Sequence, residues 1–172
     1  MRRKLKEAAG LTLVEMLAAV AVLILLGLIL NTGMQMAVGS YRTMIARSEV
    51  QLLLSTLADA LGDDLRYAQE VETDADGKLK TYQDASGDTV GLVIGPDGQA
   101  YAGDKRVLPP GAYGRGAYAV KTMDISFADA DSCFTVELKV GQKTGEISDE
   151  RTFTVRCLNP YGGTPEEGET TP

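Results

Sequence analysis

Histidine and tryptophan are absent from the 172 residues, and cysteine occurs only twice. Without histidine the chain cannot carry Ser-His-Asp or Cys-His catalysis, a histidine-ligated zinc ion or a histidine proton switch. Two cysteines are too few for a four-cysteine zinc site and allow at most one intramolecular disulfide. No other group of side chains has the pattern of a catalytic site. The sequence therefore favours a protein that is not an enzyme and that uses no cofactor.

Positive charge is scarce outside the first ten residues. Those ten hold four basic residues, Arg2, Arg3, Lys4 and Lys6, against one acidic residue. The remaining 162 residues hold 13 basic and 23 acidic residues, and the whole chain has a net charge of -7. Because contacts to phosphates need local positive charge, we expect no direct nucleic-acid partner.

A long stretch without charge follows the basic start. No charged residue lies between Glu15 and Arg42, and residues 16–30 have no polar side chain. As a helix, residues 11–30 would span about 30 Å, which matches the hydrocarbon core of a bilayer. A helix without a polar face is not expected in a soluble protein of this size. We expect a single-pass membrane protein whose basic N-terminus stays in the cytoplasm and whose chain beyond about residue 40 is extracytoplasmic.

Two ordinary explanations of this stretch remain open. A secretory signal peptide also has a basic start and an apolar middle, and cleavage after Gly39 would release a secreted domain that begins near Ser40. Alternatively, the helix is only an anchor for an extracytoplasmic binding module that is neither processed nor polymerised. Neither alternative gives a role to Glu15.

Glu15 is the single charged side chain within the apolar segment. On insertion scales, a charged side chain at the centre of a membrane helix costs about 2.5–3.5 kcal/mol, and less toward the interface. The sequence offers it no partner nearby on the apolar side. If the chain were cut before Leu11, however, a new α-ammonium group would lie four residues away. Such a group could pair with the Glu15 of a neighbouring copy.

Residues 10–15 (GLTLVE), with the basic leader before them and the apolar run behind them, resemble the processing motif of type IV prepilins and pseudopilins. The resemblance implies that a prepilin peptidase cuts between Gly10 and Leu11, and that the new amine of Leu11 is methylated. It also implies that Glu15 pairs with the Leu11 amine of another subunit during filament assembly. The chain would then be a structural subunit of a type IV pilus, or of a related secretion or DNA-uptake pseudopilus. Its partners would be other pilin subunits, the peptidase, membrane lipid and the assembly platform of the inner (cytoplasmic) membrane.

Two further features qualify the resemblance. Many major pilins have a helix-kinking proline where this chain has Thr32, and no proline occurs here before Pro96. Residues 64–68 (DLRYA) add a weaker similarity to J-type pseudopilins and their minor-pilin counterparts. The resemblance therefore favours a minor subunit but does not say which machine the subunit serves.

The rest of the chain is predicted to have an α+β fold. Apolar residues at spacings of three and four from Val50 to Ala68 predict one long helix, from about Leu11 to about Ala68. Alternating apolar and polar residues predict strands over 89–95, 134–140 and 153–157, and one strand or a pair over 117–127, with a polar connection over 141–150. We expect a long N-terminal helix, transmembrane in its first half, that packs on a small antiparallel sheet. The resemblance implies that this is a pilin-like fold.

Four segments follow from this organisation. Residues 1–10 form the basic leader, and residues 11–40 form the half of the helix that lies in the membrane or in the filament core. Residues 41–158 form an extracytoplasmic globular domain that includes the second half of the helix. Residues 159–172 are rich in proline, glycine, threonine and glutamate, so we expect a disordered tail.

The resemblance also implies a C-terminal disulfide, which would join Cys133 to Cys157. Register argues against this bond. If Phe134 and Val155 lie on one face of a simple hairpin, the two cysteines lie on opposite faces. The sequence leaves both outcomes open.

One acidic segment has part of the pattern of a calcium loop. Residues 72–77 (ETDADG) match the front of such a loop, but Gln83 stands where a bidentate glutamate is expected. We predict a polar turn there and no metal site.

Overall fold

The computed structural model describes residues 12–158, so Gly10, Leu11, the leader and the tail over 159–172 lie outside the described residues. The chain divides into two units, with the boundary between Met44 and Ile45. Among residues 12–158, the only element in the first unit is the first part of a long helix, and the second unit contains the end of that helix and all of the strands. The fold is therefore α+β, as the sequence predicts.

Helix α1 runs from Leu13 to Arg66. Its ends lie within two residues of the predicted ones. No proline occurs in the segment, so nothing in the sequence removes a backbone hydrogen bond from the helix. The last turn is closed by the amides of Tyr67 and Ala68, which donate to the carbonyls of Asp64 and Leu65. Glu70, the second residue of the first strand, has a positive φ of 46° and lies at an irregularity in the pairing of that strand.

The part of α1 in the first unit has no buried side chain. It is long and apolar enough to cross a membrane. This confirms that the N-terminal segment has the physical character of a membrane-spanning helix.

The part of α1 in the second unit has one buried face. The predicted stripe is confirmed, and it consists of Ala46, Val50, Leu53, Leu54, Leu57, Ala58, Leu61 and Leu65. These side chains join a single hydrophobic core with residues of the strands. Burial of this face, rather than helix propensity, holds this half of the helix in place.

The strands form three antiparallel sheets rather than one. The first sheet has the order β1-β2-β3, and its strands are Gln69–Thr73, Leu79–Gln83 and Thr89–Val90. The second has the order β4-β5-β6, and its strands are Leu92–Ile94, Ala100–Ala102 and Lys105–Arg106. The predicted strand over 89–95 is thus divided between two sheets. Most of these strands are too short for an alternating pattern to be read from the sequence.

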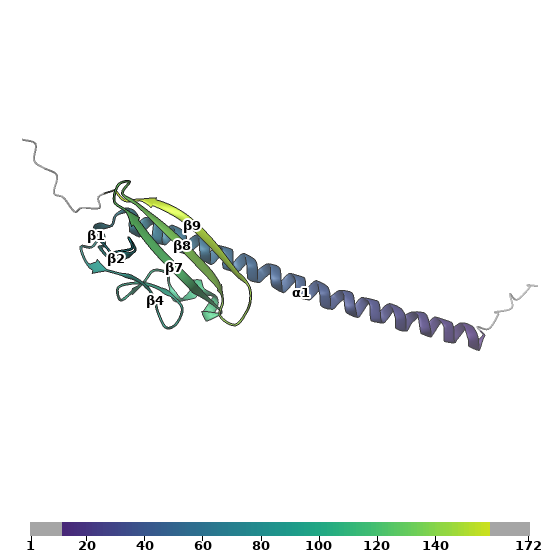
Figure 1. Cartoon of the computed structure of the whole chain (residues 1–172). Coiled ribbons are helices and arrows are strands. Elements are labelled where there is room, and N and C mark those ends of the chain that lie inside the picture. Colours follow the sequence, from purple (N-terminus) through teal and green to yellow (C-terminus); the bar gives the residue numbers. More distant parts are fainter. Residues whose placement is uncertain (1–11, 159–172) are drawn as a thin grey trace, which may run out of the picture. The chain divides into compact units, whose positions relative to one another are not determined.

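The largest sheet has the order β7-β8-β9 and lies along the C-terminal part of α1 (Figure 1). Its strands are Tyr118–Ala128, Cys133–Gln142 and Ser148–Arg156. The predicted strands over 117–127, 134–140 and 153–157 are confirmed, but the last two are extended toward each other. The connection covers residues 143–147 rather than the predicted 141–150, because Gly141 pairs with Ser148 and continues the ladder.

The inner face of this sheet supplies the other half of the core. Phe134, Val136, Leu138 and Val140 alternate along β8 and are almost completely buried. The rings of Phe127 and Phe134 lie 4.7 Å apart and are tilted by 42°, an arrangement that aromatic pairs favour. A 3-10 helix, η1 (Pro110–Gly116), covers another part of the core with the buried side chain of Tyr113.

Candidate functional site

Glu15 lies in the first turn of α1 and is held there by Thr12. Its Oε2 atom accepts hydrogen bonds from the Thr12 amide at 2.9 Å and from the Thr12 hydroxyl at 3.0 Å. The Glu15 amide in turn donates to Thr12 Oγ1 at 3.3 Å. This reciprocal pattern is a capping box, in which the residue before the helix and the third helical residue satisfy each other's amides.

The capping box gives Glu15 a partner on its N-terminal side, which the expectation about the apolar side did not consider. Its signature, threonine followed three residues later by glutamate before an apolar run, can be read from the sequence. The box matters most in an apolar environment, where water cannot satisfy the free amides of a helix end. A helix cap is therefore one physical reason for a carboxylate at this position.

The cap leaves half of the carboxylate available. Both hydrogen bonds that reach it from described residues end on Oε2, so Oε1 is open to a donor from outside residues 12–158 or from another chain. Gly10 and Leu11, the proposed cleavage pair, lie outside the described residues. The site can thus keep its helix cap while its second oxygen accepts a cation.

The polar side chains farther along this helix are also suited to an apolar environment. The hydroxyl of Thr32 donates to the Leu28 carbonyl at 2.9 Å, and that of Thr43 donates to the Gly39 carbonyl at 3.0 Å. Hydroxyl groups that bond to the preceding turn need no water. Threonine at position 32, where a proline would have removed an amide, therefore keeps the helix continuous.

The two cysteines are not joined, which corrects the disulfide that the family resemblance implied. Cys133 pairs with Arg156 across the β8–β9 ladder, while Phe134 pairs with Val155. This is the register that places the two cysteines on opposite faces. Cys133 is a half-buried free thiol, and the buried Cys157 thiol donates to the Ala68 carbonyl at 3.0 Å. Cys157 is therefore part of the hydrophobic core and forms a hydrogen bond next to the end of α1.

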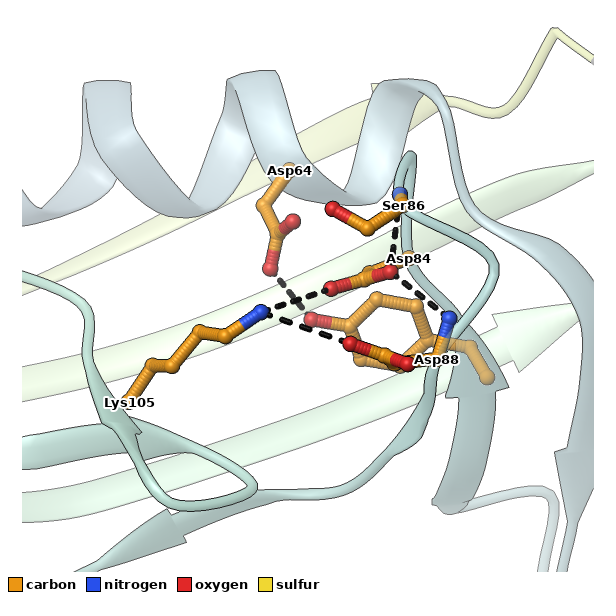
Figure 2. Close-up of polar contacts among 6 residues, drawn as sticks. Asp64, Asp84, Ser86, Asp88 and Lys105 are labelled. Carbon is orange, nitrogen blue, oxygen red and sulfur yellow. Dashed lines mark hydrogen bonds and ion pairs between the residues drawn. The ribbon is translucent and has the colours of Figure 1, made fainter.

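A second polar cluster joins three parts of the globular unit (Figure 2). The Lys105 ammonium on β6 lies 3.4 Å from a carboxylate oxygen of Asp88 and 3.9 Å from one of Asp84. Asp84 also accepts the amides of Ser86 and Asp88, which closes the turn between β2 and β3. The ion pairs of Lys105 therefore connect the β2–β3 turn to β6.

Asp64 approaches the same cluster from α1 (Figure 2). The buried Tyr82 hydroxyl on β2 donates a hydrogen bond to its carboxylate. Burial, and then the hydrogen bond to Asp64, raise the pKa of Tyr82 above its ordinary value. This bond ties the end of the helix to the first sheet. Sequence reasoning missed it because the two residues are 18 positions apart and no local pattern connects them.

The acidic segment over 72–77 does contain the predicted polar turn, although Glu72 and Thr73 belong to β1. The Asp74 side chain accepts the amides of Asp76 and Lys78 at 3.0 and 2.8 Å. These bonds use the Asp74 carboxylate to stabilise the turn. Within residues 12–158, no group of three or more acidic or cysteine side chains is placed to hold a metal ion.

Comparison with known proteins adds no relative. No protein-family model, curated protein or solved structure matches the chain. What the chain does must therefore be argued from its own residues.

Proposed function

We propose that this chain is a structural subunit of a type IV pilus or of a related pseudopilus. It is cut between Gly10 and Leu11, and its apolar helix then packs against those of other copies in the filament. Its N-terminus starts in the cytoplasm, and the unit from Ile45 onward lies outside the membrane. In this reading the chain is a minor subunit.

One observation carries the proposal. The exposed helix has one carboxylate, that of Glu15, in its first turn, and no further charged residue before Arg42. Oε1 of that carboxylate accepts no hydrogen bond from residues 12–158. An amine at Leu11 of a neighbouring copy would pair with this oxygen. Two charges that are each unfavourable in lipid are less so as a pair, although burial offsets much of the attraction. The pairing therefore sets the register between neighbouring helices more than it stabilises the filament.

The capping box supports a second candidate, a membrane-anchored binding module that is not processed. In that case Glu15 serves only to cap the helix, and its charge has no further role. The two candidates differ in the N-terminus of the mature protein and in what happens when the charge is removed.

The N-terminus is tested by intact mass and N-terminal peptide mass of the full chain from native membranes and from sheared surface material. We expect a chain that begins at Leu11 and carries an added methyl group. A chain that keeps Met1 would support the anchor, and one that begins near Ser40 would indicate secretion. Either result would remove the pilin assignment.

The role of the charge is tested with Glu15→Gln. Glutamine can replace glutamate in a capping box, so this variant loses the charge but keeps the cap. We expect normal insertion and cleavage, with at least a tenfold lower yield in filaments. Thr12→Ser is the matched control, because it alters the same box and keeps the charge and the hydroxyl. Normal incorporation of Glu15→Gln would contradict the pairing and leave the cap as the sole role of the residue.

A further inference from the structure

Strand β9 is the outer strand of the largest sheet, and its far edge is open (Figure 1). It pairs with β8, and no other strand of residues 12–158 pairs with it. The opposite edge of the sheet differs, because the amides of Val120 and Phe127 on β7 donate to the carbonyls of Gly98 and Gly77. An unpaired edge of nine residues presents a row of backbone donors and acceptors to any strand that can lie beside it.

The ladder fixes which residues of β9 face this open edge. Just before the strand, the Ile147 carbonyl accepts the Gln142 amide at 2.9 Å. Just after it, the Cys157 amide donates to the Ser132 carbonyl at 2.8 Å. The register between these two bonds has no irregularity. Because the backbone groups of an antiparallel strand point alternately to its two sides, odd-numbered residues face β8 and even-numbered residues face outward. The outward residues are Ser148, Glu150, Thr152, Thr154 and Arg156.

Most of the outward amides have no partner in the described part of the chain. The Glu150 amide donates to the side chain of its neighbour, Asp149, at 3.0 Å. The amides of Thr152, Thr154 and Arg156 meet no acceptor among residues 12–158. The side chains of these three residues are exposed as well. A second strand can therefore pair with residues 150–156 and displace only the bond of the Glu150 amide.

The side chains along this edge are complementary to those of a second copy of the same strand. If two β9 strands pair antiparallel about Phe153, Glu150 of each copy lies opposite Arg156 of the other. Thr152 then lies opposite Thr154, and the two Phe153 side chains meet at the centre. Opposite charges, threonine pairs and aromatic pairs are cross-strand pairs that stabilise antiparallel sheets. This register also places outward residues opposite outward residues, as hydrogen bonds between the two edges require.

The order of the charges selects this register. Pairing about Thr152 would also align the outward groups, but it would place neither Glu150 nor Arg156 opposite a charge. Natural edge strands are often protected by charges that repel a second strand. Here the two signs stand at opposite ends of the edge, so an antiparallel copy is attracted.

Both charged side chains are available for such a contact. The Lys139 ammonium lies 3.1 Å from Glu150 Oε2, and no hydrogen bond from residues 12–158 reaches Oε1. The Arg156 guanidinium makes no hydrogen bond or ion pair within the same residues. A second copy would supply the partner that Arg156 lacks. Exposed ion pairs add little stability by themselves, so these pairs set the register while the backbone bonds hold the strands together.

We propose that a second copy of this chain pairs with the open edge of β9, antiparallel and centred on Phe153, so that the two sheets continue into one. The same surface is used on both copies, as in a two-fold symmetric interface. This inference does not rest on the proposed function, because it concerns the globular unit and not the apolar helix.

The pairing also fixes the relative direction of the two copies. Within the globular unit α1 and β9 run the same way: Arg47 lines one pocket with Ser148, and a Cβ atom at Gly62 would lie 3.8 Å from the Val155 side chain. Antiparallel β9 strands therefore place these parts of the two α1 helices in opposite directions. Successive subunits of one filament share one direction, so this contact joins copies of separate filaments or of separate membranes.

Sedimentation velocity of the full chain in detergent, over a range of protein concentrations, tests the pairing. We expect a monomer–dimer equilibrium. Glu150→Arg and Arg156→Glu should each raise the dissociation constant about tenfold, because each variant places two like-charged pairs in its own dimer. Arg151→Glu is the matched control and should leave the constant unchanged, because position 151 lies opposite Val155. A chain that stays monomeric would overturn the inference, and so would a dimer that neither charge reversal weakens.

A mixture of the two charge-reversal variants gives a sharper result. In a mixed dimer, the charge introduced at position 150 of one chain faces the opposite charge introduced at position 156 of the other. The second pair in that dimer is the native one. We expect mixed dimers with about the dissociation constant of the unaltered chain. Failure of the mixture to dimerise would overturn the inference.

Disulfide crosslinking checks the register. Phe153→Cys, in a chain that also carries Cys133→Ser, should form a disulfide between two copies, because residues at the centre of the pairing lie opposite each other. Glu150→Cys in the same background should not, because its opposite residue is Arg156. Efficient crosslinking through position 150, or none through position 153, would overturn the inference. These measurements involve no filament, so they leave the proposed function to its own tests.

Discussion

Leu25 and Leu57 are the same residue type in the same helix, yet their surroundings are opposite. Leu25 is 60% exposed and Leu57 is completely buried. Leu57 packs in a core that the strands complete, whereas residues 13–44 have no other element to pack against in the described part of their unit. Apolar character alone therefore does not say whether a helix face meets the chain's own core or an outside partner. Lipid or another copy must cover the first unit if its apolar surface is to be shielded from water.

The largest expected effect separates the two leucines directly. Leu57→Ala removes a buried side chain from a packed core and should lower the free energy of unfolding of the globular unit by about 2–5 kcal/mol. Leu25→Ala should leave that value within about 0.5 kcal/mol. Urea unfolding of the full chain in detergent, followed by tyrosine fluorescence, measures both. Equal losses would mean that the two parts of α1 do not differ in the way their burial indicates.

A smaller effect is expected for Tyr82→Phe, which keeps the ring in the core and removes its hydrogen bond to Asp64. We expect the free energy of unfolding to fall by about 2 kcal/mol. The matched variant Tyr101→Phe removes a hydroxyl from a half-buried tyrosine and should have a smaller effect. The same urea series distinguishes them. No difference between the variants would mean that the link from the helix end to the first sheet adds little stability.

Alkaline pH should weaken the globular unit. Burial is the main reason why the pKa of Tyr82 is raised in the folded state. The phenol of an unfolded chain has a pKa of about 10.0, so the folded state binds the phenolic proton more tightly. This contribution is complete below pH 10 and is lost as the pH rises from there toward the folded pKa. The pKa of Tyr113 is raised mainly by burial and adds to the effect.

The measurement is the urea midpoint between pH 8 and pH 11. We expect a decline that begins near pH 10 and becomes shallower in Tyr82→Phe. A midpoint that stays constant up to pH 11 would contradict a protonated, buried Tyr82.

The smallest expected effect on the globular unit belongs to Thr12→Val, which removes the hydroxyl from the capping box. The Glu15 amide should exchange its hydrogen several-fold faster, because its acceptor is lost. The urea midpoint of the globular unit should not change. Hydrogen exchange with mass spectrometry, on the full chain in detergent, reports the first turn and the core in one experiment. Unchanged exchange at the N-terminus would show that the cap does not form.

Much of the fold could be predicted from local patterns. Spacings of three and four from Val50 to Leu65 gave the buried face of α1, and alternation gave the three long strands β7, β8 and β9. The capping box was equally local and was overlooked, although Thr12 and Glu15 display its signature. The short strands of the first two sheets could not be predicted, because two or three residues are too few to show a period.

By itself, the sequence determined where the chain can be helical, where it is apolar and where a carboxylate begins that apolar stretch. These properties depend on residues within a turn or two of one another. Only the tertiary structure decided that Cys133 and Cys157 are not joined, that Tyr82 meets Asp64, and that Leu52 stays exposed beside a groove. Each of these depends on strand register or on contacts between distant segments, and such contacts form only when the whole unit packs its core.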